Sequence, residues 1–194
     1  MSVIRFFVVS SILTAGLSTS LMAEPVRQHD AHEHGVSQLK IAIDKNKFLM
    51  ELEAPGADIV GFEHKAENAD QQKSIEQALA LLGAPGKLFD LPLSAGCLLS
   101  SASSEFMFHN DEDEHPEGEA EHEEHEEDEG HAEFHASYLF ICSSPGALKT
   151  MGIKFFDRFP NAEEIELEAI SDFGQLAVEI PKGTRQIDLS TIVQ

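Results

Sequence analysis

The sequence predicts an α+β fold, in which one antiparallel, sheet-dominated domain carries a single main helix and a disordered insert rich in His and acidic residues. Three observations predict this class. Apolar and polar residues alternate along several segments, which is typical of half-buried strands. Only one segment has a clear apolar face at helical spacing. A further segment has almost no apolar residues, so it cannot form a core of its own.

Residues 36–54 are expected to form the first hairpin. Leu39, Ile41 and Ile43 alternate with polar neighbours, and a polar turn then leads into a second alternating run that starts at Phe48. Pairing Ile43 with Phe48 places the apolar residues of both strands on one face. The pattern therefore predicts the register of this hairpin as well as its existence.

A helix is expected over residues 70–82, because Ile75 and Leu79 fall on one helical face with the other apolar residues of the segment. Asp70 is the expected N-cap, and Gly83 is expected to end the helix.

Further alternating segments predict the remaining strands. Residues 97–108 and 133–142 flank the insert and are expected to pair as one long hairpin. Residues 164–169 and 175–180 are expected to form a C-terminal hairpin, and residues 185–189 an edge strand.

The chain has two cysteines, Cys97 and Cys142. If they lie opposite each other in the long hairpin, the same register pairs Phe106 with Glu133, and both strands end where the insert begins. Facing positions on paired strands suit a disulfide. In an exported protein we expect this bond, whereas in a cytosolic protein a metal site or two buried thiols would be the alternative.

Residues 1–23 are expected to be a cleaved signal peptide, with Arg5 in its charged region and an apolar run over residues 6–17. A membrane anchor is the alternative, but the run is short for a span. Export would leave a His-containing leader, residues 24–35, and one domain, residues 36–194. Export would place the mature chain outside the cytoplasm.

The negative charge is concentrated in one segment. The chain has 13 Lys and Arg against 35 Asp and Glu, and 13 of these acids lie between residues 111 and 129, which contain no Lys or Arg. Such a charge attracts cations and repels nucleic acid and anionic membranes.

Residues 110–130 and their flanks combine this charge with histidines, namely His109, His115, His122, His125, His131 and His135. Imidazole nitrogen and carboxylate oxygen are common zinc ligands, and imidazole also suits copper and nickel. We expect several weak, exchanging metal sites here. The alternative is a solvated acidic loop without a metal.

A second candidate site lies at one end of the first hairpin. Its expected ligands are His32, His34 and His64, with Glu63, Asp58 or a water as the fourth. These histidines would converge for the following reason. His32 and His34 precede the first strand of the hairpin, and the register places the start of this strand opposite the end of the second strand. The loop that carries His64 follows the second strand. In the alternative, His64 caps a loop or the helix start, and the leader is a frayed terminus.

Enzyme motifs are missing from the sequence. It contains no G-x-S-x-G, P-loop, G-x-G-x-x-G or H-E-x-x-H pattern. A binding protein is therefore favoured over an enzyme.

Short motifs occur at residues 32–35 (HEHG), 53–55 (EAP), 58–64 (DIVGFEH), 91–92, 95–97, 131–142, 159–160 and 174–175. Together they resemble the ZrgA family of zinc-regulated periplasmic proteins. The resemblance implies a periplasmic zinc-binding protein of Gram-negative bacteria, made under zinc limitation and assisting zinc uptake. It implies a zinc ABC importer and its solute-binding protein as partners. Two alternatives remain. One is a non-catalytic envelope interaction or stress module with a solvated or pH-sensing tract, and the other is a copper- or nickel-binding protein.

Overall fold

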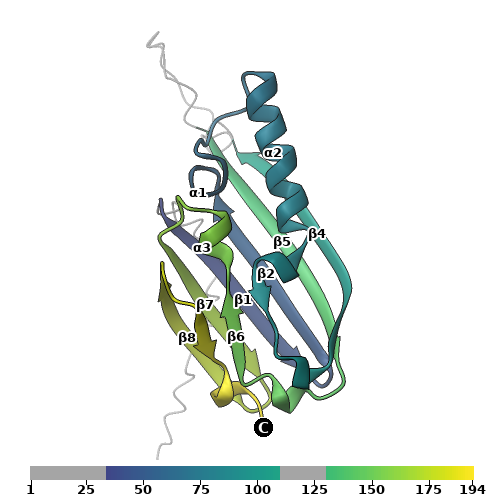
Figure 1. Cartoon of the computed structure of the whole chain (residues 1–194). Helices are drawn as coiled ribbons and strands as arrows, with labels where there is room; N and C mark the ends of the chain where they lie inside the picture. Colours follow the sequence, from purple (N-terminus) through teal and green to yellow (C-terminus); the bar gives the residue numbers. More distant parts are fainter. Residues whose placement is uncertain (1–33, 110–129) are drawn as a thin grey trace, which may run out of the picture. The chain divides into compact units, whose positions relative to one another are not determined.

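A six-stranded sheet, in the order β4-β5-β2-β1-β7-β8, forms the body of the structure (Figure 1). The computed structural model describes residues 34–109 and 130–194. The predicted signal peptide, His32 and residues 110–129 lie outside the described residues. The strands are β1 (Val36–Asp44), β2 (Lys47–Pro55), β4 (Cys97–His109), β5 (His131–Cys142), β7 (Glu164–Ser171) and β8 (Gly174–Pro181). The predicted α+β class is confirmed.

The β1–β2 hairpin has the predicted register. Ile43 lies opposite Phe48, and Leu39 lies opposite Leu52. These four side chains are buried on one face of the sheet. Local alternation was therefore sufficient to set this pairing.

Two other pairings join segments that are distant in the sequence. β2 pairs with β5 in antiparallel fashion, and β1 pairs with β7 in parallel. Two parallel strands need a long crossover connection, because a tight turn reverses the direction of the chain and so joins only antiparallel strands. The chain from β2 to β7 supplies it, and this chain includes the helices and two strands of a second sheet.

The second sheet and the helices lie on the same side of the main sheet (Figure 1). The second sheet has the order β3-β6-β9, formed by β3 (Phe89–Asp90), β6 (Thr150–Ile153) and β9 (Gln186–Asp188). The helices are α1 (Gly56–Val60), α2 (Ala69–Leu82) and α3 (Phe155–Arg158), and short 3-10 turns occur at Pro85–Lys87, Leu93–Ala95, Pro145–Ala147 and Ser190–Ile192. The expected edge strand near residues 185–189 is thus an edge of the second sheet.

The main helix begins one residue earlier than expected. Asn68, and not Asp70, is the N-cap of α2, because its side chain accepts a hydrogen bond from the backbone N–H of Gln71. The C-terminal turn of the helix is tied to the sheet by Tyr138, whose hydroxyl donates to the carbonyl of Leu82 over 2.8 Å.

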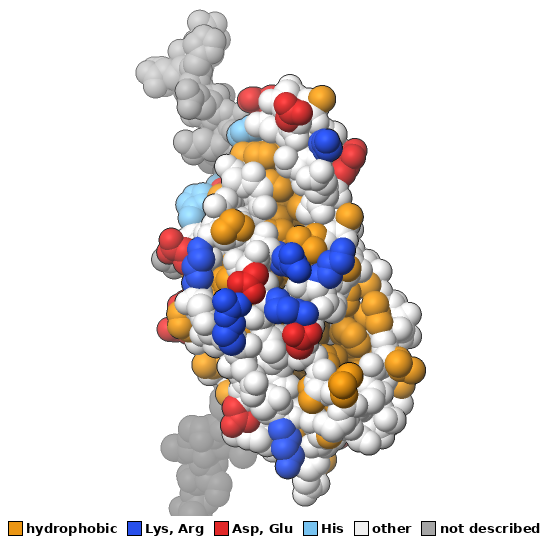
Figure 2. Space-filling model, in the orientation of Figure 1, with side chains coloured by type: hydrophobic (Ala, Val, Ile, Leu, Met, Phe, Trp, Pro, Cys, Tyr) orange, Lys and Arg blue, Asp and Glu red, His pale blue; other side chains and the backbone are white. Residues whose placement is uncertain are grey.

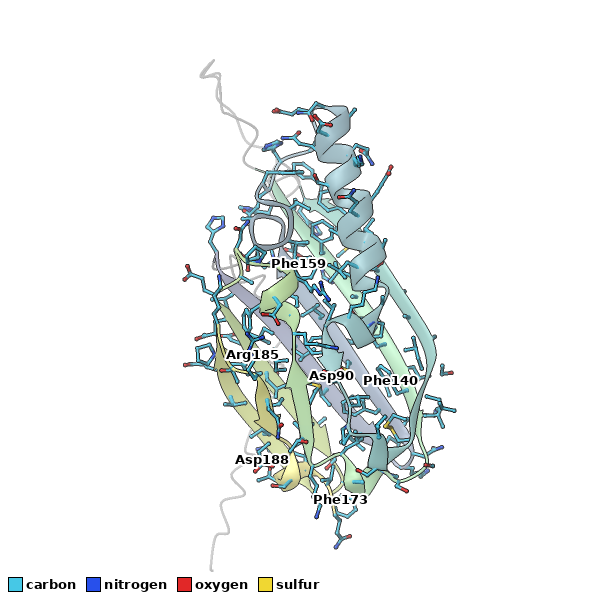
Figure 3. The ribbon with its side chains drawn as sticks, viewed as in Figure 1. Asp90, Phe140, Phe159, Phe173, Arg185 and Asp188 are labelled. Carbon is cyan, nitrogen blue, oxygen red and sulfur yellow. A yellow bond between two sulfur atoms is a disulfide. The ribbon has the colours of Figure 1, made fainter. Side chains whose placement is uncertain are left out.

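Aromatic rings fill the space between the main sheet and the elements above it. Phe155 is fully buried, and its ring lies 6.5 Å from that of Phe89 and 5.0 Å from that of Phe159. Figure 3 labels Phe159. Near the surface above them, the Lys154 ammonium pairs with Asp90 at 2.7 Å. Figure 2 shows Lys and Arg side chains gathered on this side of the molecule.

The predicted disulfide between Cys97 and Cys142 is present, and the two residues face each other in the β4–β5 hairpin. A β-bulge between Leu99 and Ser101 then shifts the register by one residue. Phe106 therefore lies opposite Phe134, with ring centroids 5.0 Å apart, and the expected pairing of Phe106 with Glu133 was wrong. The bulge changes which face of β4 each later side chain occupies.

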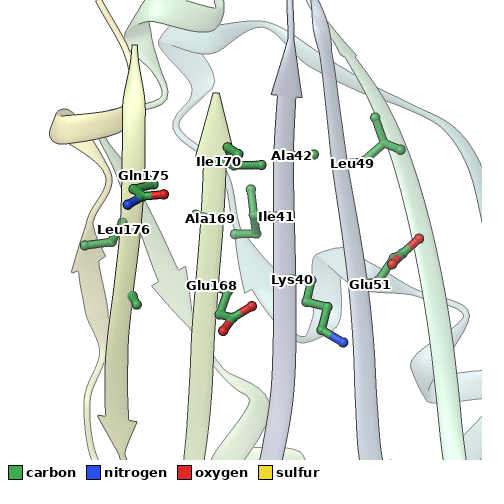
Figure 4. Close-up of a pocket in the computed structure, with 11 residues that line it drawn as sticks. Lys40, Ile41, Ala42, Leu49, Glu51, Glu168, Ala169, Ile170, Gln175 and Leu176 are labelled. Carbon is green, nitrogen blue, oxygen red and sulfur yellow. The ribbon is translucent and has the colours of Figure 1, made fainter. Parts of the chain in front are cut away.

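The other face of the main sheet, called the outer face below, keeps many of its side chains exposed. A shallow groove of about 670 Å³ runs across it (Figure 4). Leu49 and Ile170 are exposed apolar residues in this groove. Lys40 on β1 lies between two acidic side chains of this face, with Glu51 opposite it on β2 and Glu168 opposite it on β7.

Candidate metal centre

Three metal-ligating side chains meet on the outer face where β2 and β5 pair. They are Glu53, Glu133 and His135, and each offers a ligand atom within 4.8 Å of the other two. Glu133 and His135 are two residues apart on one strand, so they point to the same face. Glu53 lies directly opposite His135 in the register. Two strands are therefore enough to assemble the cluster.

A hydrogen bond between two of its members orders the cluster. Nε2 of His135 donates to Oε2 of Glu133 over 2.9 Å. Glu133 is only 6% exposed, which is unusual for a carboxylate. Two ligands bound to zinc at about 2.1 Å in tetrahedral geometry are about 3.4 Å apart. The nitrogen and oxygen atoms already lie near this spacing, so a cation could replace the proton that they share.

The pKa of His135 is raised above its ordinary value of 6.5. The main cause is the hydrogen bond to Glu133, and the charges of Glu53, Glu133 and Glu105 add to it, while burial opposes it. The acidic neighbours favour a positive charge at this position. They would stabilise a bound divalent cation for the same reason that they stabilise the imidazolium.

The cluster belongs to a row of side chains that crosses all six strands. In register order the row consists of Glu105, His135, Glu53, Gln38, Glu166 and Glu179. Its ionisable members are four carboxylates and one imidazole. The outer face thus provides an acidic surface around the cluster, whereas the side of the molecule in Figure 2 carries many of the Lys and Arg side chains.

His109 and His131, two of the expected ligands, lie beside the cluster. They are directly opposite each other at the end of the β4–β5 hairpin. His131 is two residues from Glu133, and alternation places it on the same face. The insert that separates these two histidines in the sequence therefore begins and ends next to the cluster.

The expected site at the N-terminal end of the sheet is only partly assembled. Nδ1 of His34 lies 3.2 Å from Oε1 of Glu63. His64 is turned to its own loop, because Nδ1 bonds to the carbonyl of Lys65 over 2.8 Å and the ring stacks on Phe62. In the part of the chain that the structure describes, the ligand atoms of His34, Glu63 and His64 do not form a group within 4.8 Å.

Some expected ligands cannot be placed. His32, His115, His122 and His125 lie outside the described residues. Conversely, Glu53 and Glu133 were not among the expected ligands. Alternation along the strand puts Glu133 on the same face as His135, so Glu133 could have been predicted from the sequence. Glu53 could not have been predicted in this way, because its position beside His135 depends on the pairing of β2 with β5.

The fold and the cluster define a sheet protein whose open face carries a candidate site for a divalent cation. The family model of ZrgA family zinc uptake proteins matches residues 31–189. The chain therefore belongs to the ZrgA family of zinc uptake proteins. No curated protein matches it.

Within the described ranges, no helix combines the length and the apolar character needed to cross a membrane.

Proposed function

We propose that this protein is a periplasmic zinc-binding protein, that it captures or buffers zinc and assists its uptake through a zinc ABC importer, and that Glu53, Glu133 and His135 form its folded zinc site. The observation that carries the proposal is the convergence of these three ligand atoms within 4.8 Å on the outer face. Family membership supports a role in zinc uptake.

The ligand set suits a site that exchanges its metal. Three protein ligands leave a fourth position for water or for a ligand from a partner, whereas structural zinc sites are usually closed by four protein ligands. The histidines of the insert would collect zinc weakly. His131 and His135, which follow the insert on β5, would carry it toward the folded site.

Binding and delivery, without catalysis, are the proposed mode of action. The predicted signal peptide supports export, and so does the disulfide, because such bonds persist mainly in oxidising compartments. The proposed partner is the solute-binding protein of the importer. The open fourth position would let that partner contribute a ligand during transfer.

The test is competition for zinc between the protein and a chelator at neutral pH. His135→Ala and Glu53→Gln should each weaken the tightest site about tenfold or more, because each removes one of few fixed ligands. His64→Ala is the matched control, since it removes an exposed histidine outside the cluster. Equal affinity of His135→Ala and the parent would mean that the tight site lies elsewhere.

A further inference from the structure

We propose that the groove on the outer face is a docking site for a partner protein, which inserts an extended segment where Lys or Arg alternates with apolar residues. The inference deepens the proposed function, and it rests on that function because it takes the partner to be the protein that receives the zinc. None of the groove residues on which it depends belongs to the cluster of Glu53, Glu133 and His135. Docking and zinc affinity can therefore be tested separately.

An apolar row of side chains forms the floor and the walls of the groove. Leu49, Ala42 and Ile170 lie side by side on β2, β1 and β7 (Figure 4). Because alanine is small, the surface is hollowed between the two larger side chains. Leu49 is 36% exposed and Ile170 is 59% exposed. Large apolar side chains that are exposed together in a groove are typical of a surface that binds a partner.

The next row of the groove supplies charged groups. It contains Glu51, Lys40 and Glu168 on the same three strands. None of the ion pairs among the described residues includes any of these three side chains. On the other side of the main sheet, by contrast, Asp90 is paired with Lys154. The carboxylates of the groove are therefore open to a cationic group from outside.

The charge of the outer face selects the kind of partner. The row of Lys40 and the row of the metal cluster together hold six carboxylates and one ammonium group. Such a face attracts basic groups and repels anionic lipids and nucleic acid. Two copies of the face would repel each other for the same reason. The groove therefore favours a basic partner over an anionic membrane or a face-to-face dimer.

The arrangement of the two rows suits an extended partner segment. Neighbouring residues of an extended chain point to opposite sides. A segment that lies along the boundary between the rows would direct one set of alternate side chains to the carboxylates and the other set to the apolar floor. Lys or Arg alternating with Leu, Ile or Val satisfies both rows.

The groove is also continuous with the surroundings of the metal cluster. Lys40 and Glu51 line the groove, and they also line a hollow of about 230 Å³ that His135 shares. Glu53 is two residues from Glu51 on β2, so the cluster lies about 7 Å further along the strand. A partner seated in the groove could therefore bring a ligand to the open position of the cluster.

The experiment adds a short peptide in which leucine and lysine alternate to the zinc-free mature chain. Binding is followed through the methyl resonances of Leu49, so that peptide bound elsewhere on the acidic chain does not count. The expected affinity loss is about fivefold for Ile170→Ser, through lost apolar contact, and about tenfold for Glu168→Lys, through like-charge repulsion. The same peptide with glutamate for lysine, or with serine for leucine, should bind at least about tenfold more weakly.

Two control variants match these changes outside the groove. Phe173→Ser alters an apolar residue that is 58% exposed in the turn between β7 and β8. Glu76→Lys makes the same change of charge at an exposed position of α2. Both controls should bind the peptide as the parent does, because neither residue lines the groove.

Several results would overturn the proposal. The absence of a shift at Leu49, or equal affinities of the groove variants and their controls, would mean that the groove does not bind such a segment. Self-association of the parent that Ile170→Ser abolishes, measured by sedimentation, would assign the groove to a second copy of the chain. Failure of the proposed function is read separately, from the zinc affinity of His135→Ala without peptide, and Ile170→Ser should keep the zinc affinity of the parent.

Discussion

At the scale of single residues, His135 would link proton binding to metal binding in the proposed site. Glu133 accepts a hydrogen bond from its ring, and Glu53 and Glu105 face it from the neighbouring strands. These groups raise its pKa above 6.5, with the Glu133 hydrogen bond as the main cause. A zinc ion in this site would need the neutral ring and would take the same nitrogen as the proton. Protons should therefore compete with zinc in a pH range above that of an ordinary histidine.

We predict that the zinc affinity of the tight site falls as the pH is lowered through the raised pKa of His135, starting above pH 6.5. Chelator competition between pH 6 and 8 measures the midpoint. Glu105→Gln should move this midpoint to lower pH, because it removes one charge that stabilises the imidazolium while the three ligands stay in place. An unchanged midpoint would show that another group controls the pH dependence.

The stability of the zinc-free protein should have the opposite dependence. A histidine whose folded pKa is raised contributes stability that is fully present below its unfolded pKa and is lost as the pH rises through the folded value. The free energy of unfolding of the parent should therefore exceed that of His135→Ala by more at pH 6 than at pH 8. Urea unfolding of both proteins without zinc checks the sign.

At the scale of elements, the sequence predicts the pairing and the disulfide of the β4–β5 hairpin but not its bulge. Alternation and the two cysteines predict that these strands pair and that the cysteines face each other, as observed. The bulge after Leu99 was not predictable from alternation, because Ser-rich residues fit either face of a strand. Burial decided the outcome, since the shifted register lets Phe106 pack on Phe134.

The disulfide should contribute measurably to the stability of this hairpin. Cys97 and Cys142 are 45 residues apart, and closing a loop of this size in the unfolded chain corresponds to about 4 kcal/mol in the chain-entropy model. We predict that the double variant Cys97→Ser, Cys142→Ser loses about 2–4 kcal/mol of unfolding free energy. Urea unfolding measures the loss. The parent with a reductant should match the double variant, and a loss below about 0.5 kcal/mol would contradict the prediction.

At the scale of the whole molecule, the pairings that were missed are those that assemble the candidate site. The hairpins and the main helix follow from local periodicity, which each segment carries in its own sequence. The contacts of β1 with β7 and of β2 with β5 join distant segments, and several strands with similar alternation could compete for those places. His135 was therefore found as one histidine of a tract. Its partner Glu53 appeared only once the order of the strands was known.

The same topology predicts that the folded part does not need the insert. His109 and His131 are directly paired, so the hairpin is already closed where the insert departs. Deleting residues 111–129 joins Asn110 to Gly130 and leaves an Asn-Gly pair between the two histidines. Asn-Gly is the strongest two-residue signal for a tight hairpin turn, and two residues are the number that a directly paired His109 and His131 require.

We predict that this deletion folds, and that its melting temperature without zinc is unchanged or raised by up to about 8 °C. The reason is that shortening the loop between His109 and His131 from 21 residues to 2 lowers the entropic cost of closing it by about 2 kcal/mol. Zinc stoichiometry should fall with the loss of His115, His122 and His125, while the tightest affinity stays within about threefold of the parent, because no residue of the folded cluster is removed. Differential scanning calorimetry and chelator competition measure the two quantities. The matched control is the same deletion with Ala-Ala in place of Asn-Gly. This control should melt at a lower temperature than the Asn-Gly deletion, because both positions of the tight turn need a positive φ that alanine disfavours. A deletion protein that fails to fold, or that loses the tight site, would show that residues 111–129 contribute to the domain itself.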